Sequence, residues 1–184
     1  EGRMSVKVKI CGIRNLESAQ AAVNAGADFL GFNFIPGGKR YIDPSRAKKI
    51  IDLVRNKIQI VGVFQNNDVT YVNSVASGLH LDYVQLHGRE DLEYEGKITT
   101  PIIKALTTQK ATNATYVLIG QHFDLSTIGV PFFMAGGLNS ENVEKIIREF
   151  KPFAVDVARG VEINGATDIG KTKEFVELAK GVIL

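Results

Sequence analysis

Eight short apolar runs, separated by segments with helical spacing, most constrain how this chain folds. The runs lack an alternating polar face, which is typical of parallel strands covered on both sides. Eight such strands alternating with helices are the number that closes a barrel. We therefore predict an α/β fold, a single-domain (β/α)8 TIM barrel. The runs are Lys7–Ile10, Phe29–Phe34, Ile60–Phe64, Tyr83–Leu86, Ile102–Ala105, Tyr116–Ile119, Phe132–Ala135 and Ala154–Val157.

Four helices can be predicted between these runs from apolar residues at helical spacing. Asp43-Pro44 supplies an N-cap and a proline at the first helical position for one of them. A second follows Asp68, a third starts at Asn139-Ser140, and the last should pack against the first strand. The apolar stripes, which we assign to core packing, are Ala47, Ile50, Ile51 and Val54; Val72, Val75, Ala76 and Leu79; Val143, Ile146, Ile147 and Phe150; and Phe175, Leu178, Ala179 and Val182.

Two connections, Leu106–Thr115 and Gly120–Pro131, are short for this pattern. A helical crossover between parallel strands takes about a dozen residues or more, besides any loop at the active end. Either the barrel has trimmed its fifth and sixth helices, or residues near Thr108–Thr112 and after Ile119 are absent from this sequence. We favour absent residues, because trimming would leave apolar strand faces in water at about 25 cal/mol per Å².

The length and composition suit one globular domain. The chain has 184 residues, of which 45% are hydrophobic and 23% charged, and this is enough for one core but not for two. We assign residues 4–184 to the barrel domain. Glu1-Gly2-Arg3, ahead of Met4, resembles the remnant of a cleavable expression tag.

Charge and cysteine content limit the partners that we expect. A net charge of +2 without a basic patch argues against nucleic acid. No apolar stretch approaches the ~18 residues that span a bilayer, and no secretory signal precedes the first strand. The single cysteine cannot form an internal disulfide, which agrees with a reducing cytoplasm. We expect a cytoplasmic monomer or homodimer.

The single cysteine, Cys11, ends the first apolar run directly before Gly12. Free cysteines are often small, buried and inert, and this is one interpretation of Cys11. The other interpretation follows from the barrel, in which side chains at the carboxyl ends of strands meet at the catalytic mouth.

Five motifs decide between these interpretations, because together they resemble the phosphoribosylanthranilate isomerase family from about Val8 to about Leu178. The resemblance implies an Amadori rearrangement of N-(5-phosphoribosyl)anthranilate, the third step of tryptophan synthesis from chorismate, without metal or cofactor. The motifs are Lys9-Ile10-Cys11-Gly12-Ile13, Arg40-Tyr41-Ile42, Gln85-Leu86-His87-Gly88, Gly136-Gly137-Leu138-Asn139 and Val155-Asp156-Val157.

The family reaction needs one acid and one base near the bound sugar. The resemblance makes Cys11 the base. Lys9, on the same side of the strand, can increase the thiolate fraction of Cys11 or can equally be paired for packing reasons. The family's acid is an aspartate after the sixth strand, where this chain has Gly120. We expect the acid in a segment between Ile119 and Gly120 that this sequence does not contain. Asp124, the nearest carboxylate, fits a helix N-cap better.

The resemblance also implies residues that bind the substrate. Arg40 corresponds to the arginine that faces the anthranilate carboxylate, which a guanidinium binds bidentately. Asp156 is a costly charge inside an apolar strand unless it is hydrogen-bonded or functional, and in the family it orients substrate. Gln85 and His87 should point to the same side of their strand. His87 can equally be a satisfied core histidine.

We expect the substrate phosphate at the last two strand ends, as in many barrels of this kind. Gly136 and Gly137 should open the seventh helix and let backbone amides reach an anion. The eighth strand end reads Ala158-Arg159-Gly160, where relatives carry small hydroxyl residues. We hypothesise that Arg159 partly replaces these donors beside Gly160.

Two alternatives stay open besides the isomerase. One is a barrel isomerase acting on a related aminoribosyl phosphate, against which Arg40 argues. The other is a catalytically impaired, phosphate-binding barrel, which the absence of an acid after Ile119 would support. In each case the expected partner is a phosphorylated small molecule.

Overall fold

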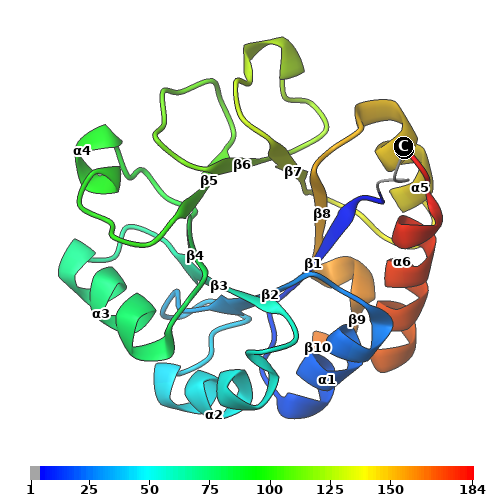
Figure 1. Ribbon diagram of the computed structural model, residues 1–184, viewed down its shortest axis with the longest axis horizontal. Helices are drawn as coiled ribbons and strands as arrows, with labels where there is room; N and C mark the ends of the chain where they lie inside the picture. Colours follow the sequence, from blue (N-terminus) through cyan, green and yellow to red (C-terminus); the bar gives the residue numbers. More distant parts are fainter. Residues whose placement is uncertain (1–4) are drawn as a thin grey trace.

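A computed structural model describes residues 5–184, and eight parallel strands close into a barrel in chain order (Figure 1). The suggested tag remnant, residues 1–3, lies outside the described residues. The predicted fold is thus confirmed. The strands are β1 Lys7–Cys11, β2 Phe29–Asn33, β3 Gln59–Phe64, β4 Tyr83–Leu86, β5 Ile102–Leu106, β6 Tyr116–Ile119, β7 Phe132–Met134 and β8 Ala154–Val157.

Helices surround most of the barrel, and the four predicted ones are present as α2, α3, α5 and α6. Asp43, Asp68 and Asp168 each accept a backbone hydrogen bond as N-caps. The helices are α1 Leu16–Ala25, α2 Pro44–Val54, α3 Val69–Leu79, α4 Leu92–Glu95, α5 Val143–Phe150 and α6 Ile169–Gly181, with 3-10 turns η1 Leu125–Thr127 and η2 Arg159–Val161.

Three helices depart from the prediction, and one of them is the short helix α4, which was not predicted. Helix α1 was not predicted, because it buries the small residues Ser18, Ala19 and Ala22 rather than a stripe of large ones. The start predicted for α5 was wrong by about one turn. The side chain of Asn139 accepts hydrogen bonds from the amides of Glu141 and Asn142, which forms a turn before the helix begins.

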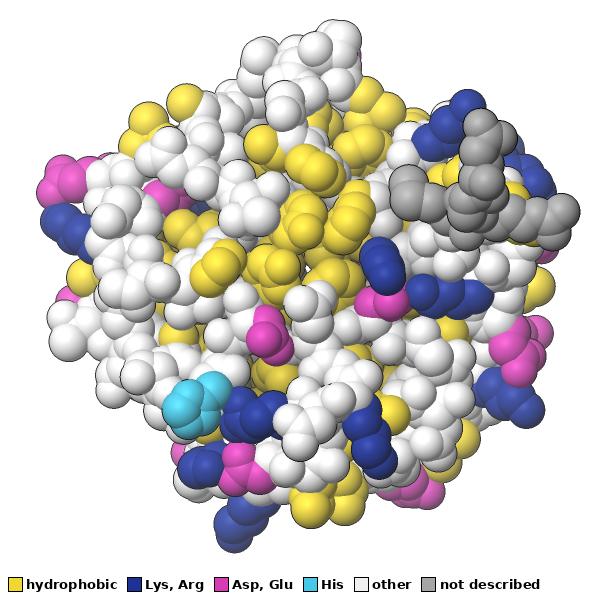
Figure 2. Space-filling model, viewed as in Figure 1, with side chains coloured by type: hydrophobic (Ala, Val, Ile, Leu, Met, Phe, Trp, Pro, Cys, Tyr) yellow, Lys and Arg dark blue, Asp and Glu magenta, His cyan; other side chains and the backbone are white. Residues whose placement is uncertain are grey.

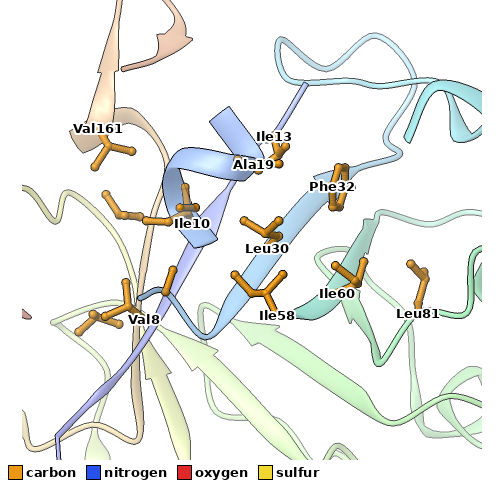
Figure 3. Packing of buried hydrophobic residues seen from close by; sticks show 14 of the residues in the cluster. Val8, Ile10, Ile13, Ala19, Leu30, Phe32, Ile58, Ile60, Leu81 and Val161 are labelled. Atoms are coloured by element: carbon orange, nitrogen blue, oxygen red, sulfur yellow. The ribbon is translucent and has the colours of Figure 1, made fainter. Parts of the chain in front are cut away.

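The core has two parts, one on each side of the strands. Between the barrel and its helices, Val8, Ile10 and Leu30 project from β1 and β2 on the side where α1 carries Ala19 (Figure 3). Inside the barrel, aromatic rings pack against one another, and Phe29 lies 5.2 Å from Phe133 between ring centroids. Apolar side chains cover the centre of the ring of strands (Figure 2). The barrel interior is therefore a packed core, as barrels of this size require.

The connections after β5 and β6 are short loops, and of these two only the second carries a helical turn, η1. The expectation that short connections would expose the outer strand faces was wrong. Val117, Ile119 and Met134 are at most 2% exposed. Partly buried loop residues, among them Phe123 and Leu125, pack against the same cluster and cover this sector without a full helix.

A small hairpin follows β8 that the sequence did not predict. It consists of β9 Glu162–Ile163 and β10 Ala166–Thr167, paired antiparallel. Asp168 after the hairpin caps α6, which packs on α1 and β1 and so closes the barrel as predicted. Within residues 5–184, no helix is long and apolar enough to cross a membrane.

A buried ion pair joins the loops after β3 and β4 to β5. Lys104 and Glu90 are 1% and 4% exposed, with 2.7 Å between Nζ and Oε2. Glu90 also accepts hydrogen bonds from the amides of Asn66 and Gly88. Burial alone would raise the pKa of Glu90, but the hydrogen bonds from Lys104 and from backbone amides, first that of Asn66, outweigh it and hold the pKa below its ordinary value.

We expect Lys104→Met to lower the free energy of unfolding by about 3–5 kcal/mol at pH 7, because it leaves the Glu90 carboxylate buried without its cation. Since the pKa of Glu90 is lowered by folding, this stabilisation is lost as pH falls below about 4.5, so the difference from wild type should shrink there. Urea unfolding at pH 7 and pH 3.5 measures both values.

The matched control is Lys97→Met, which removes an exposed partner of Glu93 and should change stability by less than about 1 kcal/mol. Equal losses for the two variants would contradict the role assigned to the buried pair.

Candidate active site

The site lies at the carboxyl ends of the strands, where a cavity of about 1030 Å³ opens. Its walls come from the loops after β2, β4, β7 and β8 and from the start of α6. This is the end at which barrels of this kind place their catalytic groups. Predicted site residues that line the cavity are Arg40, His87, Gly136, Gly137, Asp156, Arg159 and Gly160.

An ion pair between Lys9 and Asp156 joins β1 to β8 beside this cavity. The two residues are register partners, and Nζ lies 2.7 Å from Oδ1. Lys9 is completely buried, whereas the Asp156 side chain keeps 13% exposure on the cavity. Burial would lower the pKa of Lys9, but the attraction of Asp156 and of the thiol of Cys11 outweighs it and raises the pKa. Lys9 is therefore a cation at neutral pH.

Cys11 lies beside this pair, on the inner side of β1 as predicted. Cys11 is partly exposed, and it is not among the residues that line the cavity. A Cβ atom at Gly31, the register partner of Cys11 on β2, would come 2.6 Å from Sγ. A glycine at this position therefore gives the thiol its space.

The expected activation of Cys11 by Lys9 needs correction. Burial raises the pKa of the thiol, Lys9 lowers it, and Asp156 raises it again. The effect of Lys9 has the predicted sign but is outweighed, so folding raises the pKa of Cys11 overall. Burial of the thiol is the largest cause, and the negative charge of Asp156 offsets part of the stabilisation that Lys9 gives a thiolate.

Gln85 and His87 on and after β4 differ in exposure. Gln85 is 2% exposed, and its Oε1 has no hydrogen-bond partner among the described residues. His87 lines the cavity, and burial lowers its pKa, so the imidazole is mainly neutral at pH 7. Of these two predicted residues, only His87 lines the cavity.

Arg40 reaches the cavity from the loop after β2 and is already engaged by a carboxylate. Glu162 of β9 accepts hydrogen bonds from Nε at 2.6 Å and from Nη2 at 3.1 Å. The stem of Arg40 lies over Gly12, where a Cβ atom would come 2.5 Å from Cδ. Glu162 was not predicted, because no spacing in the sequence links it to Arg40.

The glycines at the ends of β7 and β8 have different structural roles. Gly136 and Gly137 adopt φ of 88° and 72° and line the cavity. Asn142 fixes their loop by donating from Nδ2 to the carbonyl of Gly137 at 2.9 Å. A Cβ atom at Gly160 would overlap the carbonyl oxygen of Leu138. Gly160 therefore lets the loop after β8 pack on the loop after β7.

No carboxylate stands at the end of β6. Ile119 continues into Gly120, where an added Cβ atom would meet nothing within 4 Å. Asp124 caps η1 by accepting hydrogen bonds from the amide and hydroxyl of Ser126, which is the predicted cap. Within residues 5–184, no three His, Cys, Asp or Glu side chains are grouped to hold a metal ion.

Comparison with known proteins identifies this arrangement. A family model described as "N-(5'phosphoribosyl)anthranilate (PRA) isomerase" matches residues 8–130 and 116–178. The chain belongs to this isomerase family. The N-(5'-phosphoribosyl)anthranilate isomerase of Streptococcus mutans is 37% identical over 191 positions, covering 95% of this chain and 98% of the relative.

Solved structures of the isomerase family agree with the fold. A phosphoribosyl anthranilate isomerase in complex with reduced 1-(o-carboxyphenylamino)-1-deoxyribulose 5-phosphate is 36% identical with a TM-score of 0.86, covering 96% of this chain and all of that chain. The enzyme from Thermotoga maritima is 37% identical over the same shares, with a TM-score of 0.86.

The chain departs from the isomerase family between β6 and β7. The two matched segments both include residues 116–130, so the family match is not continuous through this region. The 191 positions aligned with the S. mutans relative exceed the whole length of this chain, although only 95% of the chain takes part. The relative thus carries residues that this chain lacks.

Alkylation can test the raised pKa of Cys11, since it is the only cysteine in the chain. Because the thiolate is the reacting form, iodoacetamide should modify Cys11 more slowly at pH 7.5 than it modifies N-acetylcysteine. The rate should still increase with pH above about 8.5, the ordinary thiol pKa. Intact-mass spectrometry measures both.

The control is the same chain unfolded in urea, whose pH profile should return to that of a free thiol. A rate for the folded protein that levels off near pH 7 would show a lowered pKa and contradict this description of the site.

Proposed function

We propose that this chain catalyses the Amadori rearrangement of N-(5'-phosphoribosyl)anthranilate to 1-(2-carboxyphenylamino)-1-deoxyribulose 5-phosphate, a step of tryptophan biosynthesis. The observation that supports it most is the family match combined with the location of the motif residues. Arg40, Asp156 and Gly136-Gly137 line one cavity, and Cys11 lies beside Lys9, the ion-pair partner of Asp156. The substrate is an anion at both ends, and cations line the same cavity.

The reaction is a series of proton transfers in which the sugar gains two protons and loses two. Protonation of the furanose ring oxygen breaks its bond to C1 and gives an iminium ion. The thiolate of Cys11 then takes the proton from C2, and the resulting enolamine becomes the ketone when C1 gains a proton and the C2 hydroxyl loses one. A raised thiol pKa leaves little thiolate at pH 7 but makes that thiolate a stronger base.

We place the phosphate against the loop after β7. The positive φ of Gly136 and Gly137 and the hydrogen bond from Asn142 hold this loop in a conformation open to the cavity. Backbone amides in such loops bind anions without a side chain. Arg159, exposed on the cavity wall, adds a cation.

The general acid stays a prediction, located in residues between Ile119 and Gly120 that this sequence lacks. The split family match, the extra aligned positions of the relatives and the open space at Gly120 all support it. The absence of a carboxylate between Ile119 and Gly120 also favours a second candidate, a barrel that binds the sugar phosphate but is catalytically impaired. A monomer or homodimer in the cytoplasm also stays a prediction.

The gene sequence and complementation separate these candidates. We expect an aspartate codon between Ile119 and Gly120, and we expect the complete gene to restore growth of a tryptophan auxotroph that lacks the isomerase. Cys11→Ala should lower kcat by about 10²- to 10⁴-fold, the usual contribution of a general base. Steady-state kinetics on the purified protein measures this.

A complete gene without a carboxylate at that point that still complements would rule out our assignment of the acid. A complete gene that fails to complement, while its product binds the substrate phosphate, would favour the impaired barrel.

Arg159→Ala tests the phosphate site. We expect KM to rise about tenfold, the loss of one hydrogen bond to a charged group, with a much smaller change in kcat. Lys173→Ala is the control, since Lys173 lies on α6 and pairs with Glu177 away from the cavity wall. An unchanged KM for Arg159→Ala would reject the phosphate contact.

A further inference from the structure

We infer that Glu162 is a positioning residue that orients Arg40, so that one edge of the guanidinium faces the carboxylate of the substrate. The inference rests on the proposed function, because it takes Arg40 as the group that binds this carboxylate. It adds a residue from the hairpin after β8, which is outside the five sequence motifs.

The ion pair is enclosed on one side and open on the other. The side chain of Glu162 is 8% exposed and does not line the cavity, whereas that of Arg40 is 30% exposed and does. Glu162 therefore lies behind Arg40 as seen from the cavity. Its effect on a ligand has to pass through the guanidinium.

The hydrogen bonds leave the correct edge free. A guanidinium has five N–H groups in one plane. Glu162 accepts from Nε and Nη2, which is one edge of this plane. The neighbouring edge, with Nη1 and the second N–H of Nη2, can still bind another carboxylate bidentately. Because the group is planar and rigid, fixing one edge fixes the direction of the other.

The backbone on both sides of the pair is tied together as well. Arg14 donates hydrogen bonds to the carbonyl of Lys39, next to Arg40, at 3.1 Å, and to the carbonyl of Gly165 in the hairpin. Together with the stem lying over Gly12, this holds Arg40 along its length. Such preorganisation lowers the entropy that binding must overcome.

The pair also sets the direction in which substrate binds. The substrate has a carboxylate at one end and a phosphate at the other, and Lys39, Arg159 and Lys171 line the cavity besides Arg40. A mobile Arg40 could pair with either anion. Glu162 keeps it at one place and so excludes the reversed orientation, which would put C2 away from Cys11.

Glu162→Gln tests the inference, with binding of reduced 1-(o-carboxyphenylamino)-1-deoxyribulose 5-phosphate followed by calorimetry. We expect about tenfold weaker binding, the loss expected for one charge-assisted interaction. The same compound without its carboxyl group should bind wild type and Glu162→Gln alike. In an Arg40→Ala background, Glu162→Gln should have no further effect, because its action passes through Arg40.

The controls separate positioning from folding. Glu93→Gln removes the acid of an exposed pair and should leave binding unchanged. Thermal unfolding of each variant shows whether it is folded, and Glu162→Asp, which keeps the charge but withdraws the carboxylate, replaces Glu162→Gln if that variant does not fold. It should show a smaller loss that again depends on Arg40 and on the ligand carboxyl group.

Three results would overturn the inference: no loss with Glu162→Gln, an equal loss for both ligands, or an undiminished loss in the Arg40→Ala background. Failure of the proposed function looks different, because wild type itself would then neither isomerise the substrate nor prefer the ligand with the carboxyl group.

Discussion

The ion pair between Lys9 and Asp156 joins the first and last strands of the barrel, and the site is arranged around it. A fully buried ammonium is costly unless a carboxylate compensates it, so removal of either partner would leave an unpaired charge in the interior. The same pair places the Asp156 carboxylate on the cavity wall and a cation beside Cys11. One contact therefore links the two strands that close the barrel to the placement of the reactive groups.

A second buried lysine shows that such a pair is not by itself a functional site. Lys104 and Glu90 are as buried as Lys9, and the remaining capacity of Glu90 is taken up by backbone amides. Asp156 differs because part of its carboxylate stays exposed to the cavity. Free acceptor capacity toward a cavity, rather than burial or ion pairing, distinguishes the group that can act on a ligand.

Sequence patterns predicted what depends on neighbours in the chain. The apolar runs located all eight strands, with ends shifted by at most one residue, because a strand covered on both faces must be apolar throughout. Glu162 escaped prediction because its partner Arg40 lies 122 positions away. The raised pKa of Cys11 was also missed. Burial of the thiol and the effect of the Asp156 charge both arise only when the barrel closes.

The sector between β5 and β7 shows why fold and chemistry can be separated in this barrel. Loop residues such as Phe123 and Leu125 cover the outer strand faces in place of full helices, so Val117 and Ile119 stay buried. The core therefore does not require full helices between β5 and β7. The opposite holds for β1 and β8, where Lys9 and Asp156 serve the core and the cavity at once. The connection after Ile119 can thus vary while the barrel stays closed, whereas a loss of Lys9 or Asp156 would affect both the core and the cavity.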